Sequence, residues 1–104
     1  MKAYGLEWTD PITVNTDIVP ANESGIFIIL HFFPTSMAER DTEFLARAVC
    51  IGYGNIKAGI RAYMDDERFE HYTPKCQIWT RIPEDKQIAE KQRIQAKLKC
   101  RSYC

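Results

Sequence analysis

The chain has 104 residues, of which 45% are hydrophobic, and its 14 basic and 14 acidic side chains give a formal net charge of zero. This length and composition fit one globular domain with its own hydrophobic core. The longest apolar run, residues 26–33, is much shorter than the roughly 20 residues of a membrane-spanning helix. Charges at Lys2, Glu7 and Asp10 interrupt any apolar segment of a secretory signal. We therefore expect a soluble, cytoplasmic protein with no membrane partner.

Charged residues are unevenly distributed along the chain. Residues 1–45 carry two basic and seven acidic side chains, a balance of −5, whereas residues 81–104 carry seven basic and three acidic ones, a balance of +4. This asymmetry permits an anionic partner at the C-terminal end, although a solvated helix face would produce it too. The four cysteines are expected to be reduced, because the chain shows no export signal.

The first half of the chain predicts strands. Residues 1–24 alternate apolar residues with turn formers and predict one short strand at residues 12–14. Residues 25–33 (GIFIILHFF) form a continuous β-branched and aromatic run, which is typical of a strand buried on both faces. The polar, aperiodic residues 34–43 predict a loop, and residues 44–51 (FLARAVCI) predict a second strand.

A glycine turn and a helix are predicted next. Two glycines in residues 52–54 allow backbone angles that other residues avoid, and Asn55 is a favourable N-cap. Apolar residues then recur with the period of one helix face. They are Ile56, Ile60, Tyr63 and Met64. We expect this helix to end before Pro74.

The C-terminal part predicts a third strand at residues 76–82 (CQIWTRI) and a helix at residues 84–100. On that helix Ile88, Ile94 and Leu98 share an arc of about 120° and are expected to face the core. The predicted order is ββαβα. It corresponds to a small α+β fold with a mainly antiparallel three-stranded sheet flanked by helices, to which the strand at residues 12–14 adds an N-terminal edge.

These elements and their short motifs resemble the GIY-YIG nuclease superfamily, whose domain is a three-stranded antiparallel sheet flanked by helices. Residues 25–27 (GIF) stand at the first signature and residues 50–52 (CIG) at the second. Residues 55–57 (NIK) resemble the Asn-Leu-Lys that commonly starts the first helix of the family. Glu90 matches the placement of the metal-binding glutamate. The resemblance implies a single GIY-YIG-like domain at residues 25–104, preceded by an N-terminal extension, residues 1–24.

Members of this family cut DNA with a divalent metal held by the glutamate. Their signature tyrosines position or deprotonate the attacking water, and a helix arginine steadies the phosphate. In this chain Phe27 and Cys50 stand in place of the two tyrosines, and Gly59 stands in place of the arginine. Of the family's two tyrosines, arginine and glutamate, this chain has only the glutamate, Glu90. Local substitutes are Tyr53, which follows the second signature, and Arg61, two residues beyond the arginine position. His31 at the end of the first strand is a third, as a base, although a histidine in a buried strand is also typical of a hydrogen-bonded core residue.

Three functions are compatible with these replacements. The leading interpretation is a degenerate GIY-YIG-like domain without enzymatic activity, which binds nucleic acid or another protein and belongs to a mobile element. The first alternative is an active DNA endonuclease that uses Tyr53, Arg61 and Glu90 as catalytic residues, with Mg²⁺ or Mn²⁺ held by Glu90. The second is a small structural or interaction protein of unrelated function, which forms a homodimer through the exposed face of the sheet.

Basic side chains on both predicted helices are candidates for contacts with a phosphate backbone. They are Lys57, Arg61, Lys91, Lys97 and Lys99. A net charge of zero and a pI near 6.7 are unusual for a dedicated DNA-binding protein. Structural roles are the alternative for the residues at the family's signature positions. Phe27 and Cys50 would be core residues, and Glu90 would pair with Lys86 or Arg93 on an exposed helix face.

Overall fold

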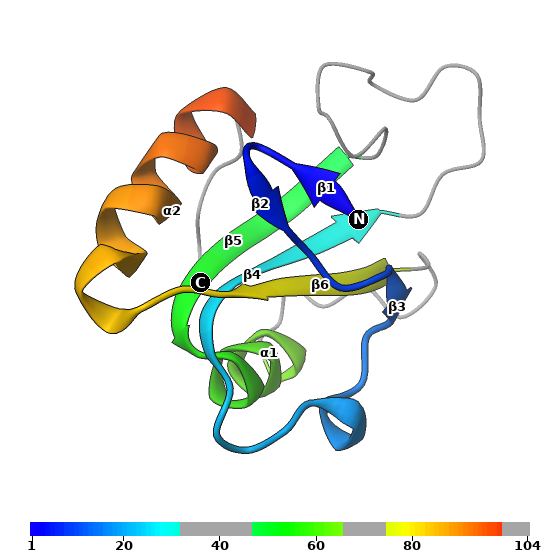
Figure 1. Ribbon diagram of the computed structural model, residues 1–104. Helices are drawn as coiled ribbons and strands as arrows, with labels where there is room; N and C mark the ends of the chain where they lie inside the picture. Colours follow the sequence, from blue (N-terminus) through cyan, green and yellow to red (C-terminus); the bar gives the residue numbers. More distant parts are fainter. Residues whose placement is uncertain (32–46, 66–74, 99–104) are drawn as a thin grey trace.

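The structure is a computed structural model that describes residues 1–31, 47–65 and 75–98 (Figure 1). Its elements, in chain order, are β1 (Lys2–Ala3), β2 (Leu6–Glu7), β3 (Ile12–Thr13), the 3₁₀ helix η1 (Thr16–Ile18), β4 (Ser24–His31), β5 (Arg47–Asn55), α1 (Ile56–Met64), β6 (Lys75–Arg81) and α2 (Glu84–Leu98). Four strands form one antiparallel sheet in the order β3-β6-β4-β5, and β1 and β2 form a separate hairpin. The predicted α+β class is confirmed. The predicted edge strand is β3, which pairs with β6.

Strand β4 lies in the centre of the sheet because its residues are apolar on both faces. It pairs with β5 on one side and with β6 on the other. Ile26, Ile28 and Leu30 belong to the hydrophobic cluster on one face, whereas Phe27 and Ile29 belong to the cluster on the other face. All five side chains are at most 2% exposed. Alternation along one strand thus builds the two cores.

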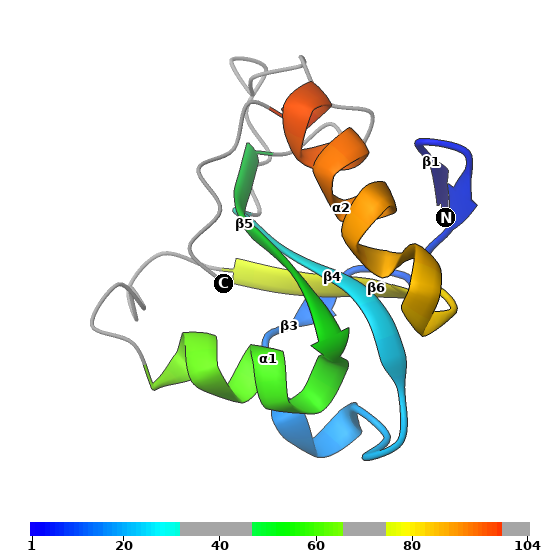
Figure 2. The same ribbon diagram turned by 90° about the vertical axis from the view of Figure 1, so that its left-hand side faces the viewer.

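Helix α2 and the β1–β2 hairpin cover one face of the sheet (Figure 2). The helix turns Gln87 toward the core and leaves Ile88 53% exposed, so the prediction for Ile88 is wrong. The Gln87 side chain donates hydrogen bonds to Ser24 Oγ at 2.9 Å and to the Ile82 carbonyl at 2.8 Å. Ile94 and Leu98 lie on the same buried side of the helix as Gln87.

Helix α1 and η1 cover the opposite face (Figure 1). Ile56, Ile60 and Tyr63 are buried, as the helical period predicts. Asn55 is the N-cap: its side-chain oxygen accepts a hydrogen bond from the Ala58 amide at 2.9 Å. Both faces of the sheet thus carry helices, and the homodimer through an exposed face of the sheet stays a prediction.

The predicted glycine turn is wrong, because β5 continues through Gly52, Tyr53 and Gly54 to Asn55. Gly54 has φ of 98°, a conformation that favours glycine, and it is the cross-strand partner of Gly25. At Gly25 a Cβ atom would overlap the Thr80 carbonyl oxygen of β6. The glycine of the first motif is therefore explained by the close approach of β4 and β6.

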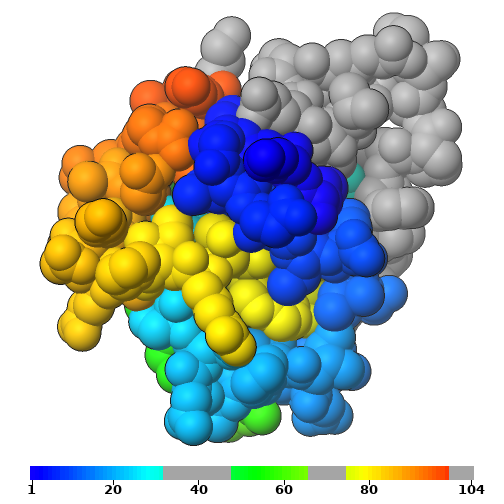
Figure 3. Space-filling view, in the orientation of Figure 1, coloured from blue at the N-terminus to red at the C-terminus, as the bar shows by residue number. Residues whose placement is uncertain are grey.

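The N-terminal residues pack into both cores. Tyr4 and Trp8 are buried in the cluster on the α2 side, and Val14 and Val19 are buried in the cluster on the α1 side. The space-filling view shows this segment lying against β6 and α2 (Figure 3). The division into an extension at residues 1–24 and a domain at residues 25–104 stays a prediction.

The cysteines differ in state. Cys76 is a buried free thiol, and burial raises its pKa. Cys50 is disulfide-bonded, so the expectation of a reduced thiol is wrong there. The predicted loop at residues 34–43 lies outside the described residues. Neither α1 nor α2, the two α-helices of the described ranges, combines the length and apolar character that a membrane span requires.

Candidate functional site

The replaced signature positions meet inside the core on the α1 side. Phe27 on β4 and Cys50 on β5 are each 1% exposed and belong to the same hydrophobic cluster. Gly59 on α1 faces the ring of Phe27 so closely that a Cβ atom at Gly59 would overlap Cε1 and Cζ of the ring. The resemblance expects a tyrosine hydroxyl at Phe27 and a guanidinium at Gly59. In this structure the Phe27 ring packs against the helix at Gly59 and fills the space between them.

Glu90 lies on α2, on the opposite side of the sheet from α1. Its Oε2 accepts hydrogen bonds from Arg93 Nε at 2.9 Å and from Arg93 Nη2 at 2.6 Å. The same Nη2 donates to the Tyr4 carbonyl at 2.7 Å. Tyr4 and Gly5 have φ of 54° and 78°, the left-handed pair that a two-residue hairpin turn requires. Glu90 thus orients an arginine that fastens the hairpin to α2.

The surroundings of Glu90 do not fit a divalent metal. A metal ion would compete with the guanidinium of Arg93 for Oε2, which already accepts two hydrogen bonds. Across the described ranges, no three His, Cys, Asp or Glu side chains lie together as metal ligands would. The Mg²⁺ or Mn²⁺ site at Glu90 stays a prediction of the resemblance.

The three predicted catalytic residues lie on two sides of the sheet. Tyr53 lies two residues after Ile51 on β5 and shares its strand face, which is the face of the cluster on the α2 side; Tyr53 is 47% exposed. Arg61 is on α1, across the sheet from Glu90. The structure therefore does not place Tyr53, Arg61 and Glu90 around one reacting group.

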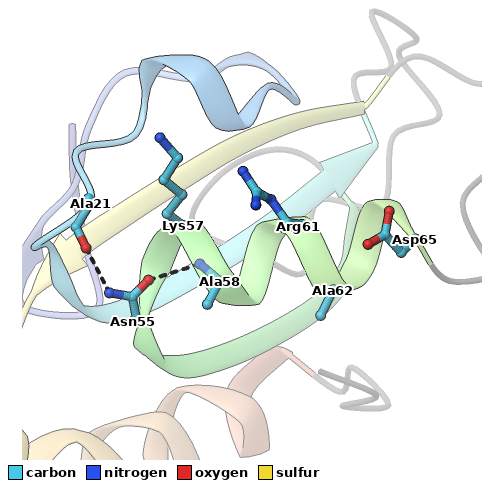
Figure 4. A pocket seen from close by; sticks show the side chains of 7 residues that line it. All are labelled: Ala21, Asn55, Lys57, Ala58, Arg61, Ala62 and Asp65. Carbon is cyan, nitrogen blue, oxygen red and sulfur yellow. Dashed lines mark hydrogen bonds between the residues drawn. The ribbon is translucent and has the colours of Figure 1, made fainter.

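Two of the predicted basic residues do lie together, on α1. Lys57 and Arg61 are one helical turn apart and line a hollow of about 470 Å³. Figure 4 shows both side chains extending in the same direction from the helix. The other lining residues are Ala21, Asn55, Ala58, Ala62 and Asp65. Within the described part of the chain, neither cation has a hydrogen-bonding or ion-pairing partner.

The hollow is open because its neighbouring helix positions are small. Ala58 and Ala62 are exposed and have no side chain that would block an approaching ligand. Asn55 is already engaged, since its side chain caps α1 and donates to the Ala21 carbonyl at 2.8 Å. The N-terminal end of the helix dipole adds positive potential beside Lys57. The carboxylate of Asp65 lies at the other end of the hollow and offsets part of this charge, so anionic ligands are favoured at the end that holds Lys57.

The other predicted basic residues do not extend this hollow. Lys91 and Lys97 are on α2, which packs on the other face of the sheet. Lys99 lies outside the described residues. The hollow itself could not be derived from the sequence, because its wall at Ala21 is separated from α1 by more than thirty residues.

Sequence reasoning also missed an ion pair at the end of β6. Arg81 Nε donates to Glu23 Oε2 at 2.5 Å, and Arg81 Nη2 donates to Glu23 Oε1. The guanidinium holds the pKa of the Glu23 carboxyl below its usual range, and the carboxylate raises the pKa of Arg81. The Glu23 side chain is 8% exposed and that of Arg81 is 80% exposed. Hollows of about 630 and 530 Å³ both include this pair among their lining residues.

Comparison with known proteins assigns no family. No family model, curated protein or solved structure matches this chain. The candidate site consequently rests on the geometry of the described residues, and the α1 hollow is its best-defined part.

Proposed function

We propose that this chain is a non-catalytic, GIY-YIG-like module that binds nucleic acid through the hollow on α1. The observation that carries the proposal is the pair of unpartnered cations, Lys57 and Arg61, which line one hollow. Contacts from lysine and arginine to phosphates supply most of the affinity in sequence-independent binding of nucleic acids. The resemblance of the strand and helix motifs to a family of DNA-cutting enzymes supports this choice of anion.

The spacing of the two cations suits neighbouring phosphates of one strand. Lys57 and Arg61 are four residues apart, which is about 6 Å along the helix axis. The alanines beside them allow a backbone to approach the helix surface. Two phosphate contacts predict a weak dependence on salt, with a slope of log K against log salt near −1.8 for duplex and near −1.4 for single-stranded DNA.

The packing of the signature positions supports a module without nuclease chemistry. A nuclease needs a proton acceptor, a cation and a metal held around the same phosphate. Here a phenyl ring fills the space at Gly59, and Glu90 is bonded to Arg93 on the other side of the sheet. Recruiting Tyr53, Arg61 and Glu90 together would require a rearrangement across the sheet.

Fluorescence anisotropy tests the binding proposal. Labelled 20-nucleotide single strands and duplexes are titrated with protein between 50 and 200 mM salt. We expect Lys57→Ala and Arg61→Ala each to weaken binding and to reduce the salt slope by about one phosphate contact. The matched control is Lys97→Ala on α2, which should bind as the unmodified chain does. Binding that is absent, or that both α1 variants leave unchanged, contradicts the proposal.

A plasmid assay tests the absence of nuclease activity separately. The chain and its Glu90→Ala variant are incubated with supercoiled plasmid in Mg²⁺ and then in Mn²⁺. We expect no nicking above the background of the variant. Nicking that disappears in the Glu90→Ala protein would support the endonuclease instead.

A further inference from the structure

Helix α2 carries an exposed apolar side chain on the flank that faces away from the hairpin. Arg93 contacts the Tyr4 carbonyl of the hairpin, which identifies one flank of the helix. Ile88 lies five residues earlier, about 140° around the axis, on the other flank. Figure 2 shows α2 between the hairpin and β5, so the flank of Ile88 is directed toward the β5 side.

A second exposed hydrophobic residue lies on the same side of the sheet. Tyr53 on β5 is 47% exposed and shares its strand face with Ile51, which packs in the cluster beneath α2. Ile88 is 53% exposed. β5 is also the terminal strand in the sheet order β3-β6-β4-β5. Tyr53 and Ile88 are therefore exposed on the α2 face of the sheet, Tyr53 on its edge strand and Ile88 on the helix that packs against that strand.

The charges around Ile88 are arranged symmetrically. Glu84 lies four residues before Ile88 and Lys91 three residues after it, and the three residues share an arc of about 60° on the helix. Among the described residues, neither Glu84 nor Lys91 has an ion-pairing partner. An acidic and a basic group at nearly equal distances on either side of an isoleucine form a self-complementary pattern for an antiparallel helix.

We propose that a second copy of this chain docks on this flank and forms a two-fold symmetric dimer centred on Ile88. In the dimer the two α2 helices run antiparallel, and Ile88 contacts Ile88 of the partner subunit. Glu84 of each copy then lies opposite the partner subunit's Lys91. A two-fold interface uses the same patch on both subunits, which the arrangement Glu84, Ile88, Lys91 satisfies.

Such a dimer is weak, because the patch is small. A 15-residue helix is about 22 Å long, and contacts along one helix bury less than the roughly 1,200 Å² of a stable interface. We therefore expect association in the range of about 0.1 to 1 mM, where the free energy of binding is only about 4 to 5 kcal/mol. This surface is separate from the α1 hollow, so dimerisation and nucleic-acid binding can fail independently.

Sedimentation equilibrium between about 10 μM and 1 mM at low salt tests the dimer. We expect Ile88→Lys to raise the dissociation constant about tenfold or more, because it places two like charges at the symmetry axis. Ile18→Lys is the matched control, since Ile18 is 46% exposed on η1. A chain that stays monomeric up to 1 mM, or a dimer that Ile88→Lys leaves intact, overturns the proposal.

Charge reversal distinguishes this arrangement from any other dimer. Glu84→Lys and Lys91→Glu should each weaken association about fivefold, since each sets like charges opposite one another. The double variant restores opposite charges across the interface and should return to within about twofold of the unmodified chain. Failure of this restoration, with helix content unchanged by circular dichroism, rules out the antiparallel arrangement.

Discussion

The two faces of the sheet are held together in different ways. On the α1 side, the helix packs through apolar side chains and through the fit of the Phe27 ring against Gly59, while the buried Gln77 of β6 bonds to the Asn15 backbone. On the α2 side, polar side chains fasten the helix: Gln87 bonds to Ser24 and Ile82, and Arg93 bonds to Tyr4. Both helices bury apolar side chains against the sheet, and α2 adds side-chain hydrogen bonds to this packing.

The two faces also differ in what they do with the residues to which the resemblance draws attention. On the α1 side, Phe27, Cys50 and Gly59 lie in a close-packed interior, and the charged groups Lys57 and Arg61 are on the outer surface of the helix. On the α2 side, Glu90 keeps its carboxylate but uses it to orient Arg93. The residues at these positions therefore serve packing on one side of the sheet and hydrogen bonding between α2 and the hairpin on the other.

The largest expected effect on the free energy of unfolding is in β4, whose side chains pack into both cores. Gly25→Ala should lower the free energy of unfolding by about 3 kcal/mol or more, because its Cβ meets the Thr80 backbone, which cannot move without displacing β6. Urea denaturation measures the change. The control is Gly54→Ala, where only the positive φ opposes alanine and about 1 to 2 kcal/mol should be lost. Equal losses at both glycines would contradict the close approach of β4 and β6.

The second prediction tests the packing of the α1 side. In an exposed helix, glycine to alanine stabilises by about 1 kcal/mol. At Gly59 we expect the opposite sign, a loss of about 2 kcal/mol, because the new methyl group overlaps the ring of Phe27. In a Phe27→Leu background the same change should cost less than about 1 kcal/mol. A double-mutant cycle without coupling between the two positions would show that they are not in contact.

The third prediction tests the hydrogen bonds of the α2 side. Gln87→Met keeps the length of the side chain but removes both donors, and the Ile82 carbonyl loses its bond from Gln87. We expect a loss of about 1 to 2 kcal/mol in the free energy of unfolding. Gln92→Met on the exposed side of α2 is the control and should change stability by less than about 0.5 kcal/mol. If both variants are equally stable, packing alone positions α2.

The smallest effect is expected at the Glu23–Arg81 pair and depends on pH. The pKa of Glu23 is lower in the folded chain than in the unfolded chain, so the folded state binds fewer protons there. The pair therefore stabilises the fold at neutral pH, and this contribution is lost as the pH falls below about 4.3, the ordinary pKa of a glutamate, and through the lowered value. Thermal melts from pH 7 to pH 3 should show Glu23→Gln below the unmodified chain at neutral pH and the two curves converging in acid. Parallel curves would contradict the assignment.

Sequence patterns predicted the elements better than they predicted the site. The apolar run at residues 25–33 and the helical period from Ile56 to Tyr63 are local properties, and the structure confirms the strand in its described part and the helix. The glycine turn after Ile51 was wrong because cross-strand pairing with β4 extends β5 to Asn55. The prediction that Ile88 faces the core was wrong because hydrophobic periodicity contains no information on the hydrogen-bond acceptors that Gln87 meets in the core.

By itself, the sequence determined the α+β composition, the burial of strand β4 on both faces and the capped start of α1, since each depends on neighbouring residues. The tertiary structure decided which side chains share a surface. It placed Lys57 beside Arg61 in one hollow, put Glu90 across the sheet from them, and joined Glu23 to Arg81. The physical reason is that alternation along a strand assigns a residue to one of two faces, whereas the identity of each face depends on which helix packs there. That packing is set by contacts between residues far apart in the chain.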